Sequence, residues 1–200
     1  MVKVKFCGLK RPCDIVWANE LRPDYAGFVF AGKKRRVSDD QAAALRKALD
    51  PSIPAVGVFV DDSLEHIGQL VTAGTIQIVQ LHGCEDDAMI EAVQQTLKVR
   101  VIKAFSIASE ADVRQARCSR ADYILLDHGA GGTGDCFDWA LLAHIDRPYF
   151  LAGGLNPDNA AQAAALQPFA LDVSSGIETD GVKDKEKMKR FMAQVRAYRR

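Results

Sequence analysis

The chain has 200 residues, of which 48% are hydrophobic and 26% charged, and its 26 basic and 26 acidic side chains cancel at pH 7. This composition is that of a globular protein with room for a core, and it excludes a nucleic-acid or membrane partner held by bulk charge. No apolar run approaches the ~18 residues that a membrane span requires. The five cysteines are odd in number and contain no CxxC pair, so we expect reduced thiols and a cytoplasmic protein.

Short runs rich in Val, Ile, Phe and Leu alternate along the chain with longer segments of helical periodicity. The short runs predict eight strands, over residues 2–6, 25–30, 55–60, 76–81, 99–105, 123–126, 149–152 and 170–173. A predicted helix follows each strand, over residues 12–21, 39–48, from about 63, 85–95, 109–117, 139–143, 158–166 and 185–198. We expect Ser38 to cap the second helix, and Ser63 or one of the two aspartates before it to cap the third.

Strict alternation of strand and helix predicts an α/β fold with parallel strands and helices on the outside. Eight such units either close into a barrel or form a large open sheet, and the count of eight favours a (β/α)8 TIM barrel. No linker, low-complexity segment or charge block divides the chain, so residues 1–200 are expected to form a single domain. An open nucleotide-binding sheet is disfavoured because no GxGxxG motif follows the first strand.

Candidate functional residues are those that follow the strands, because TIM barrels place their active sites at the C-terminal ends of the strands. Gly153-Gly154 and Ser174-Ser175-Gly176 follow the seventh and eighth strands, where many barrels hold a phosphate with backbone N–H groups. The same glycines are also compatible with simple tight turns. The presence of both segments on neighbouring strands favours a small phosphorylated molecule as the partner.

Two residues on this rim are suited to proton transfer. Cys7 closes the first strand; a thiolate in a cationic setting is a base or a nucleophile, although an inert buried cysteine fits the same position. Asp127 closes the sixth strand, where it either caps the following loop or donates a proton. The first and sixth strands are well separated around a barrel, so the two side chains can face a substrate from different sides.

Other polar residues on the rim are open to two interpretations. The run Lys33-Lys34-Arg35-Arg36 after the second strand is either a solvated loop or a clamp for a second anion such as a carboxylate. His82, after the fourth strand, is either structural or a polar contact for the substrate. No spacing of His, Cys and Glu resembles a metal-ligand set, so neither a metal nor a cofactor is expected.

Taken together, these rim segments resemble the phosphoribosylanthranilate isomerase family along the whole chain. The matching segments are Lys5-Phe6-Cys7-Gly8, Gly27-Phe28-Val29-Phe30, Val56-Gly57-Val58-Phe59, Val79-Gln80-Leu81-His82-Gly83, Leu126-Asp127, Gly131-Gly132-Thr133-Gly134, Phe137-Asp138-Trp139, Leu151-Ala152-Gly153-Gly154-Leu155-Asn156 and Asp172-Val173-Ser174-Ser175-Gly176-Ile177-Glu178. No single segment is decisive, but all of them in this order, in a chain of this length, are specific.

The resemblance implies a cofactor-free Amadori rearrangement in tryptophan biosynthesis. In this reaction the ribose ring of N-(5-phosphoribosyl)anthranilate opens and isomerises to 1-(2-carboxyphenylamino)-1-deoxyribulose 5-phosphate. The resemblance implies Cys7 as the general base, Asp127 as the general acid, and Arg35 or Arg36 as the clamp for the anthranilate carboxylate, with the alignment favouring Arg35. The family often has Ser-Pro-Arg where this chain has its cationic run. The remaining expected substrate contacts are His82, Gly132, Gly134, Gly153, Gly154, Ser174, Ser175 and Gly176.

Two alternative functions remain at this point. The related isomerase of the histidine pathway is expected to carry an aspartate where Cys7 stands, and a non-catalytic phosphate-binding barrel needs neither Cys7 nor Asp127. The presence of both residues therefore favours the phosphoribosylanthranilate reaction. The sequence is compatible with a monomer or a homodimer.

Overall fold

The computed structural model describes residues 1–127 and 139–198, and eight of its strands form one closed parallel barrel. The strands are β1 (Lys3–Cys7), β2 (Tyr25–Val29), β3 (Ala55–Phe59), β4 (Ile78–Leu81), β5 (Arg100–Ser106), β6 (Tyr123–Asp127), β7 (Tyr149–Leu151) and β8 (Ala170–Val173). Each strand pairs with the next along the chain, and β8 pairs with β1 to close the ring. The predicted (β/α)8 TIM barrel is therefore confirmed.

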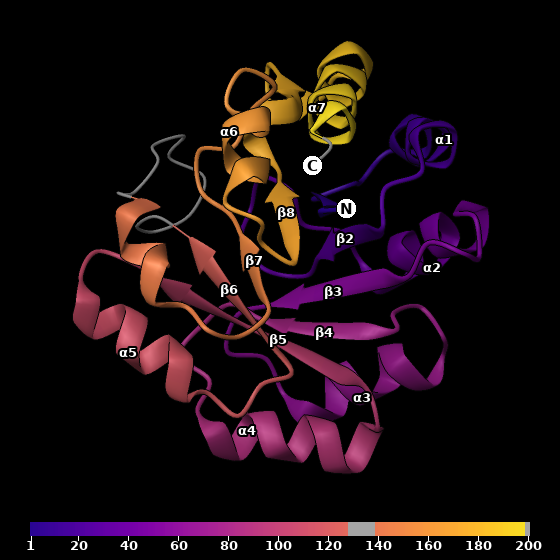
Figure 1. Cartoon of the computed structure of the whole chain (residues 1–200). Helices are drawn as coiled ribbons and strands as arrows, with labels where there is room; N and C mark the ends of the chain where they lie inside the picture. Colours follow the sequence, from indigo (N-terminus) through magenta and orange to yellow (C-terminus); the bar gives the residue numbers. More distant parts are fainter. Residues whose placement is uncertain (128–138, 199–200) are drawn as a thin grey trace.

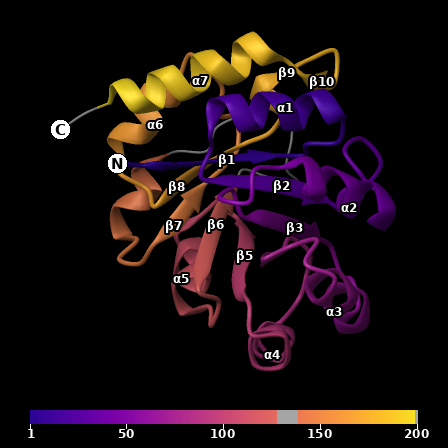
Figure 2. The same cartoon turned by 90° about the vertical axis from the view of Figure 1, so that its right-hand side faces the viewer.

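Helices lie around the outside of the barrel, as Figures 1 and 2 show from two directions. They are α1 (Pro12–Leu21), α2 (Asp39–Ala48), α3 (Leu64–Thr72), α4 (Asp87–Ala92), α5 (Glu110–Cys118), α6 (Ala160–Ala165) and α7 (Lys185–Ala197). Two short 3-10 helices, η2 (Trp139–His144) and η3 (Ser175–Ile177), lie after β6 and β8. Ser38 caps α2 as predicted, and Ser63, one of the three alternatives for the next helix, caps α3. Each side chain accepts a hydrogen bond from a backbone N–H three residues later.

The helix after β4 differs from the prediction at both ends. It begins at Asp87, two residues later than expected, because the Asp86 side chain accepts a hydrogen bond from the Met89 N–H and caps the helix there. Its last turn widens into a π-helix, η1 (Val93–Leu97), which a pattern of 3.6-residue periodicity does not anticipate.

A small hairpin between β8 and α7 was not predicted. It consists of β9 (Glu178–Thr179) and β10 (Val182–Lys183), which pair antiparallel through a turn at Asp180 and Gly181, both with positive φ. Strands of two residues are too short to give a periodic signal. The hairpin matters for the site described below, because Glu178 and Lys183 both contact residues at the C-terminal ends of the strands.

The inside of the barrel is apolar at one end and polar at the other. Near the N-terminal ends of the strands, the rings of Tyr25, Tyr123, Phe150 and Phe169 pack together with centroid separations of 4.6–5.7 Å. Side chains alternate between the two faces of a strand, so the inward positions further along β1, β4, β6 and β8 lie at the other end. Charged and polar residues occupy those positions.

Candidate active site

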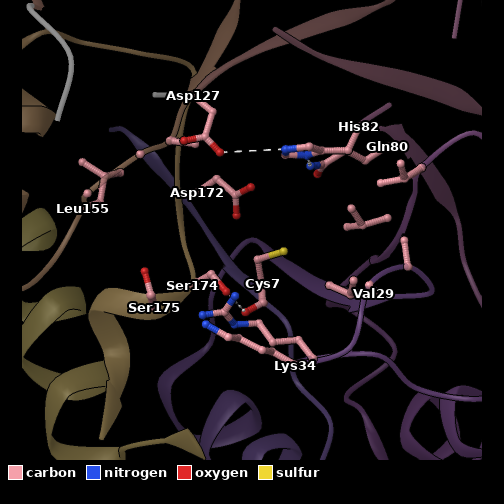
Figure 3. A pocket seen from close by; sticks show the side chains of 18 of the residues that line it. Cys7, Val29, Lys34, Gln80, His82, Asp127, Leu155, Asp172, Ser174 and Ser175 are labelled. Atoms are coloured by element: carbon pink, nitrogen blue, oxygen red, sulfur yellow. Dashed lines mark hydrogen bonds and ion pairs between the residues drawn. The ribbon is translucent and has the colours of Figure 1, made fainter. Parts of the chain in front are cut away.

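A cavity of about 330 Å³ opens at the C-terminal end of the barrel. Figure 3 shows the side chains that point into it from several strands. Its volume lies within the usual range for a small-molecule site. The cavity is lined by Cys7, Val29, Ala31, Gly32, Lys33, Lys34, Arg35, Val58, Val60, Gln80, His82, Asp127, Ala152, Gly153, Gly154, Leu155, Asp172, Ser174 and Ser175.

Cys7 is the last residue of β1 and points into this cavity (Figure 3). Gly27 pairs with it on β2, and a Cβ at Gly27 would lie only 3.1 Å from the Cys7 Sγ, so the glycine makes room for the thiol. Burial raises the pKa of the Cys7 thiol, and the Asp172 carboxylate adds to this effect. The ammonium groups of Lys5 and Lys183 act in the opposite direction.

A buried ion pair between β1 and β8 lies beside Cys7 inside the barrel. The Lys5 Nζ donates a hydrogen bond of 2.8 Å to the Asp172 Oδ2, and the two residues are paired directly in the register of β1 and β8. Burial tends to lower the pKa of Lys5, but Asp172 and Cys7 together outweigh it and the pKa is raised, so Lys5 is charged. The other carboxylate oxygen of Asp172 is buried without a hydrogen-bond partner within the described part of the chain.

Asp127 and His82 form the opposite wall of the cavity. The His82 Nε2 lies 3.9 Å from the Asp127 Oδ2, which is too long for a direct hydrogen bond. The Gln80 side-chain amide nitrogen lies 3.0 Å from the His82 Nδ1, so the Gln80 amide group and the His82 ring are within hydrogen-bond distance of each other. Burial lowers the pKa of His82, which favours the neutral imidazole at pH 7, and its Nε2 faces Asp127.

Arg35 is fixed at the mouth of the cavity by the unpredicted hairpin. Its Nε and Nη2 donate to the two carboxylate oxygens of Glu178 at 2.7 and 2.8 Å, a bidentate pair that holds the guanidinium plane. Glu178 also accepts a hydrogen bond of 2.6 Å from the buried Lys183 Nζ. Although its burial acts in the opposite sense, these two cations lower the pKa of Glu178 from 4.5 to about 2.

The loops after β7 and β8 lie against each other at the cavity wall. Gly153 and Gly154 both have positive φ and line the cavity together with Ser174 and Ser175. Gly176 does not line it; a Cβ there would lie 1.8 Å from the Leu155 carbonyl oxygen, so this glycine permits the close approach of the two loops.

The comparison with known families agrees with this geometry. Residues 4–194 match the family model described as N-(5'phosphoribosyl)anthranilate (PRA) isomerase. The chain belongs to this family. A PRA isomerase of Endomicrobium trichonymphae is 45% identical over 193 residues, covering 94% of this chain and 95% of the relative. A PRA isomerase of Clostridium acetobutylicum is 42% identical over 208 residues, covering both chains fully.

Solved PRA isomerase structures share the same barrel. The enzyme of Thermotoga maritima superposes with a TM-score of 0.92 at 37% identity, covering 98% of this chain and 100% of that one. A PRA isomerase in complex with reduced 1-(o-carboxyphenylamino)-1-deoxyribulose 5-phosphate superposes with a TM-score of 0.89 at 35% identity, with the same coverage.

The PRA isomerase residues predicted from the sequence are largely brought together by the fold. The predicted residues that line the cavity are Cys7, Arg35, His82, Asp127, Gly153, Gly154, Ser174 and Ser175. Arg36 lies instead beside a neighbouring hollow formed with Phe30 and His66, and its backbone bridges to Val29. Gly132 and Gly134 lie outside the described residues.

Sequence reasoning did not single out four polar residues at or beside the candidate site: Gln80 and Asp172, which line the cavity, and Lys5 and Lys183, which contact residues that line it. The first three stand at inward positions of β1, β4 and β8. The strands that contain Gln80 and Asp172 are otherwise apolar, whereas β1 alternates charged and apolar residues. A charged or amide side chain at a position that the strand pattern buries could have identified these residues, because a buried polar group requires a partner. Lys183 gave no such signal, because it lies on the unpredicted hairpin.

Two further findings concern ligands and membranes. Within residues 1–127 and 139–198, no three His, Cys, Asp or Glu side chains are grouped in a way that could hold a metal ion. In the same part of the chain, no helix is both long and apolar enough to cross a membrane. Cys7, Cys13, Cys84 and Cys118 are free thiols.

Proposed function

We propose that the chain isomerises N-(5'-phosphoribosyl)anthranilate in tryptophan biosynthesis, with Asp127 as the general acid and Cys7 as the general base. The observation that carries the assignment of the two roles is that a thiol and a carboxyl from β1 and β6 point into one cavity (Figure 3). Family membership and the complex of a relative with a reduced product analogue support the reaction itself.

The first step is opening of the ribose ring. Asp127 protonates the furanose ring oxygen, the bond from that oxygen to C1 breaks, and the nitrogen lone pair forms a Schiff base with C1. The His82 Nε2 lies 3.9 Å from the Asp127 Oδ2. A substrate hydroxyl that lies to one side of these two atoms, at hydrogen-bond distance from each, can bridge them, and this contact is the role that we propose for His82.

The second step is removal of the C2 proton. Cys7 as a thiolate accepts this proton, and the electrons move into the C1–C2 bond and neutralise the nitrogen, giving an enolamine that tautomerises to the ketone. Each of the two proton transfers is worth about 10²–10⁴-fold in rate. All bonds that change lie within one substrate molecule, so the residues named here supply the whole reaction and no cofactor is proposed.

Two anions of the substrate orient it between Cys7 and Asp127. We assign the anthranilate carboxylate to Arg35, whose guanidinium is held in place by Glu178. We assign the phosphate to the loops after β7 and β8, where Gly153-Gly154 and Ser174-Ser175 line the same side of the cavity. Anchoring both ends fixes the reacting carbon near the thiol, which supplies the positioning part of catalysis.

The experiment that tests this proposal follows the fluorescence of freshly generated phosphoribosylanthranilate. Cys7→Ala and Asp127→Asn should each lower kcat by about 10²–10⁴-fold while KM changes little. Cys118→Ala and Asp158→Asn serve as matched controls, because both residues are exposed on the outside of the barrel. A Cys7→Ala protein with near wild-type turnover would refute the base assignment, and no turnover by the folded wild type would refute the reaction.

Other expectations remain part of the proposal. We propose one domain over residues 1–200, a cytoplasmic location, and no nucleic-acid partner. A structural relative at 36% identity is a dimeric PRA isomerase of Thermotoga maritima from which monomers were generated, so a monomer and a homodimer are both proposed for this chain. Light scattering at several concentrations distinguishes them.

A further inference from the structure

Lys5 is a buried cation that the proposed reaction does not use. It lies inside the barrel with no exposed surface, where an ammonium group is costly unless it is paired. It is not among the described residues that line the cavity, so the substrate does not reach it. A charge at this position therefore acts through its neighbours.

The neighbours of Lys5 are Asp172 and Cys7. Lys5 and Cys7 are two residues apart on β1, so both side chains point to the inside of the barrel. A Cβ at Gly27 would lie 3.1 Å from the Cys7 Sγ and 3.3 Å from the Lys5 Cε, so the two side chains converge over the same glycine. The hydrogen bond of 2.8 Å to Asp172 fixes the far end of the lysine.

The charges around the Cys7 thiol are not balanced. The groups that act on it are Lys5 on β1, Lys183 on β10, Arg35 after β2 and Asp172 on β8, with His82 and Asp127 across the cavity. Asp172 pairs with Lys5, whereas Glu178 is shared by Arg35 and Lys183. On the Cys7 side of the cavity, these pairs contain three cationic side chains and two carboxylates. The negative charge of a Cys7 thiolate would therefore be compensated.

We propose that Lys5 is a positioning residue for proton transfer at Cys7: Asp172 holds its ammonium group beside the thiol, where the charge stabilises the thiolate. The inference rests on the proposed role of Cys7 as the base. In a buried site, desolvation and the Asp172 carboxylate both disfavour a second anion, so Cys7 needs a fixed cation to ionise. Lys5 supplies it without occupying space in the substrate cavity.

The test measures ionisation of Cys7 in the absence of substrate. Alkylation by iodoacetamide proceeds through the thiolate, and mass spectrometry of the Cys7 peptide follows it as a function of pH. Loss of an opposite charge at close range shifts a titration by about 1–3 pH units. Lys5→Met should therefore raise the pH midpoint of Cys7 alkylation and slow the reaction at neutral pH by at least about tenfold. Exposed Cys118 in the same samples is the internal control and should react equally in both proteins.

A second pair of variants separates electrostatics from damage to the fold. Asp172→Asn removes the carboxylate that disfavours the thiolate, so it should lower the alkylation midpoint, opposite in direction to Lys5→Met. The double variant Lys5→Met/Asp172→Asn leaves no unpaired buried charge, and its midpoint should lie above that of Asp172→Asn alone. This comparison decides the matter even where Lys5→Met by itself does not fold.

The outcomes distinguish this inference from the proposed function. An alkylation midpoint that does not differ between Asp172→Asn and the double variant overturns the role of Lys5, whatever the role of Cys7. Full turnover by Cys7→Ala overturns the base assignment, whatever the alkylation result. If both proposals hold, the acidic limb of the kcat/KM profile moves to higher pH in Lys5→Met by the same amount as the alkylation midpoint, and Lys5→Arg restores it toward the wild-type position.

Discussion

Replacing Glu178 by glutamine removes the one carboxylate that Arg35 and Lys183 share. Because the pKa of Glu178 falls from 4.5 to about 2 in the folded protein, the ionised carboxylate favours folding at neutral pH. This difference corresponds to on the order of 3 kcal/mol. The Arg35 side chain keeps about a fifth of its surface exposed, which screens part of the interaction, so we expect Glu178→Gln to cost about 2–3 kcal/mol.

The pH dependence of this loss has a definite sign. A carboxyl group whose pKa is lowered by folding contributes stability above its unfolded pKa, and the contribution is lost as the pH falls through the folded value. The difference in unfolding free energy between wild type and Glu178→Gln should therefore be constant above about pH 5 and shrink as the pH falls from 4.5 toward 2.

Urea denaturation followed by circular dichroism, from neutral pH down to about pH 3, measures this difference. Asp158→Asn is the matched control: it breaks a pair with Arg190 that is largely exposed, and it should change stability by less than about 0.5 kcal/mol. The reasoning would be refuted if wild type and Glu178→Gln differed in unfolding free energy by less than about 0.5 kcal/mol at neutral pH. A difference that does not change with pH would refute it as well. The variant should also raise KM more than it lowers kcat, because Arg35 loses the contact that orients it.

Two other perturbations test separate parts of the structure. Gly176→Ala places a Cβ 1.8 Å from the Leu155 carbonyl oxygen, so we expect it to cost about 1–3 kcal/mol in thermal unfolding and to raise KM, and a wild-type KM would contradict the proposed phosphate loops. Burial tends to lower the pKa of His66, but Asp39 and Asp62 outweigh it and raise the pKa above 6.5, so its ion pairs stabilise the fold below that pH and lose this effect as the pH rises through the raised value. His66→Gln should therefore cost up to about 1 kcal/mol in urea denaturation below about pH 6 and almost nothing near pH 9; a cost independent of pH would show that the charge of His66 is not involved.

The strand and helix pattern was largely predictable because it depends on local sequence. Ser38 caps its helix as expected, since a cap needs only a side-chain oxygen near a backbone N–H three residues on, and Ser63 was one of three candidates for the next cap. The bounds of the helix after β4 were less predictable, because Asp86 caps the helix while the carboxylate of Glu85 pairs with the distant Lys103. The π-turn that ends this helix and the hairpin before α7 have no periodic signature.

The candidate site was predictable only in part. Cys7 and Asp127 stand at the C-terminal ends of strands, directly after the predicted residues 2–6 and 123–126. A barrel places all strand ends of one direction on one rim, so their presence in a common cavity followed from the repeat alone. The choice between Arg35 and Arg36 was not decided by the sequence. Neighbouring residues of an irregular loop point in directions set by their contacts, and the bidentate contact with Glu178 places Arg35 at the cavity.

By itself, the sequence determined the eightfold strand–helix repeat, the polar rim, and the family to which the chain belongs. Only the tertiary structure decided which charges meet. Lys5 and Asp172 are 167 residues apart, and they pair because closure of the barrel brings β8 beside β1 in a register that sets them opposite each other. Arg35 and Glu178 are 143 residues apart and meet through a hairpin with no sequence signal. The hydrophobic periodicity of the sequence indicates which way a side chain faces, whereas contact between distant segments depends on barrel closure and strand register.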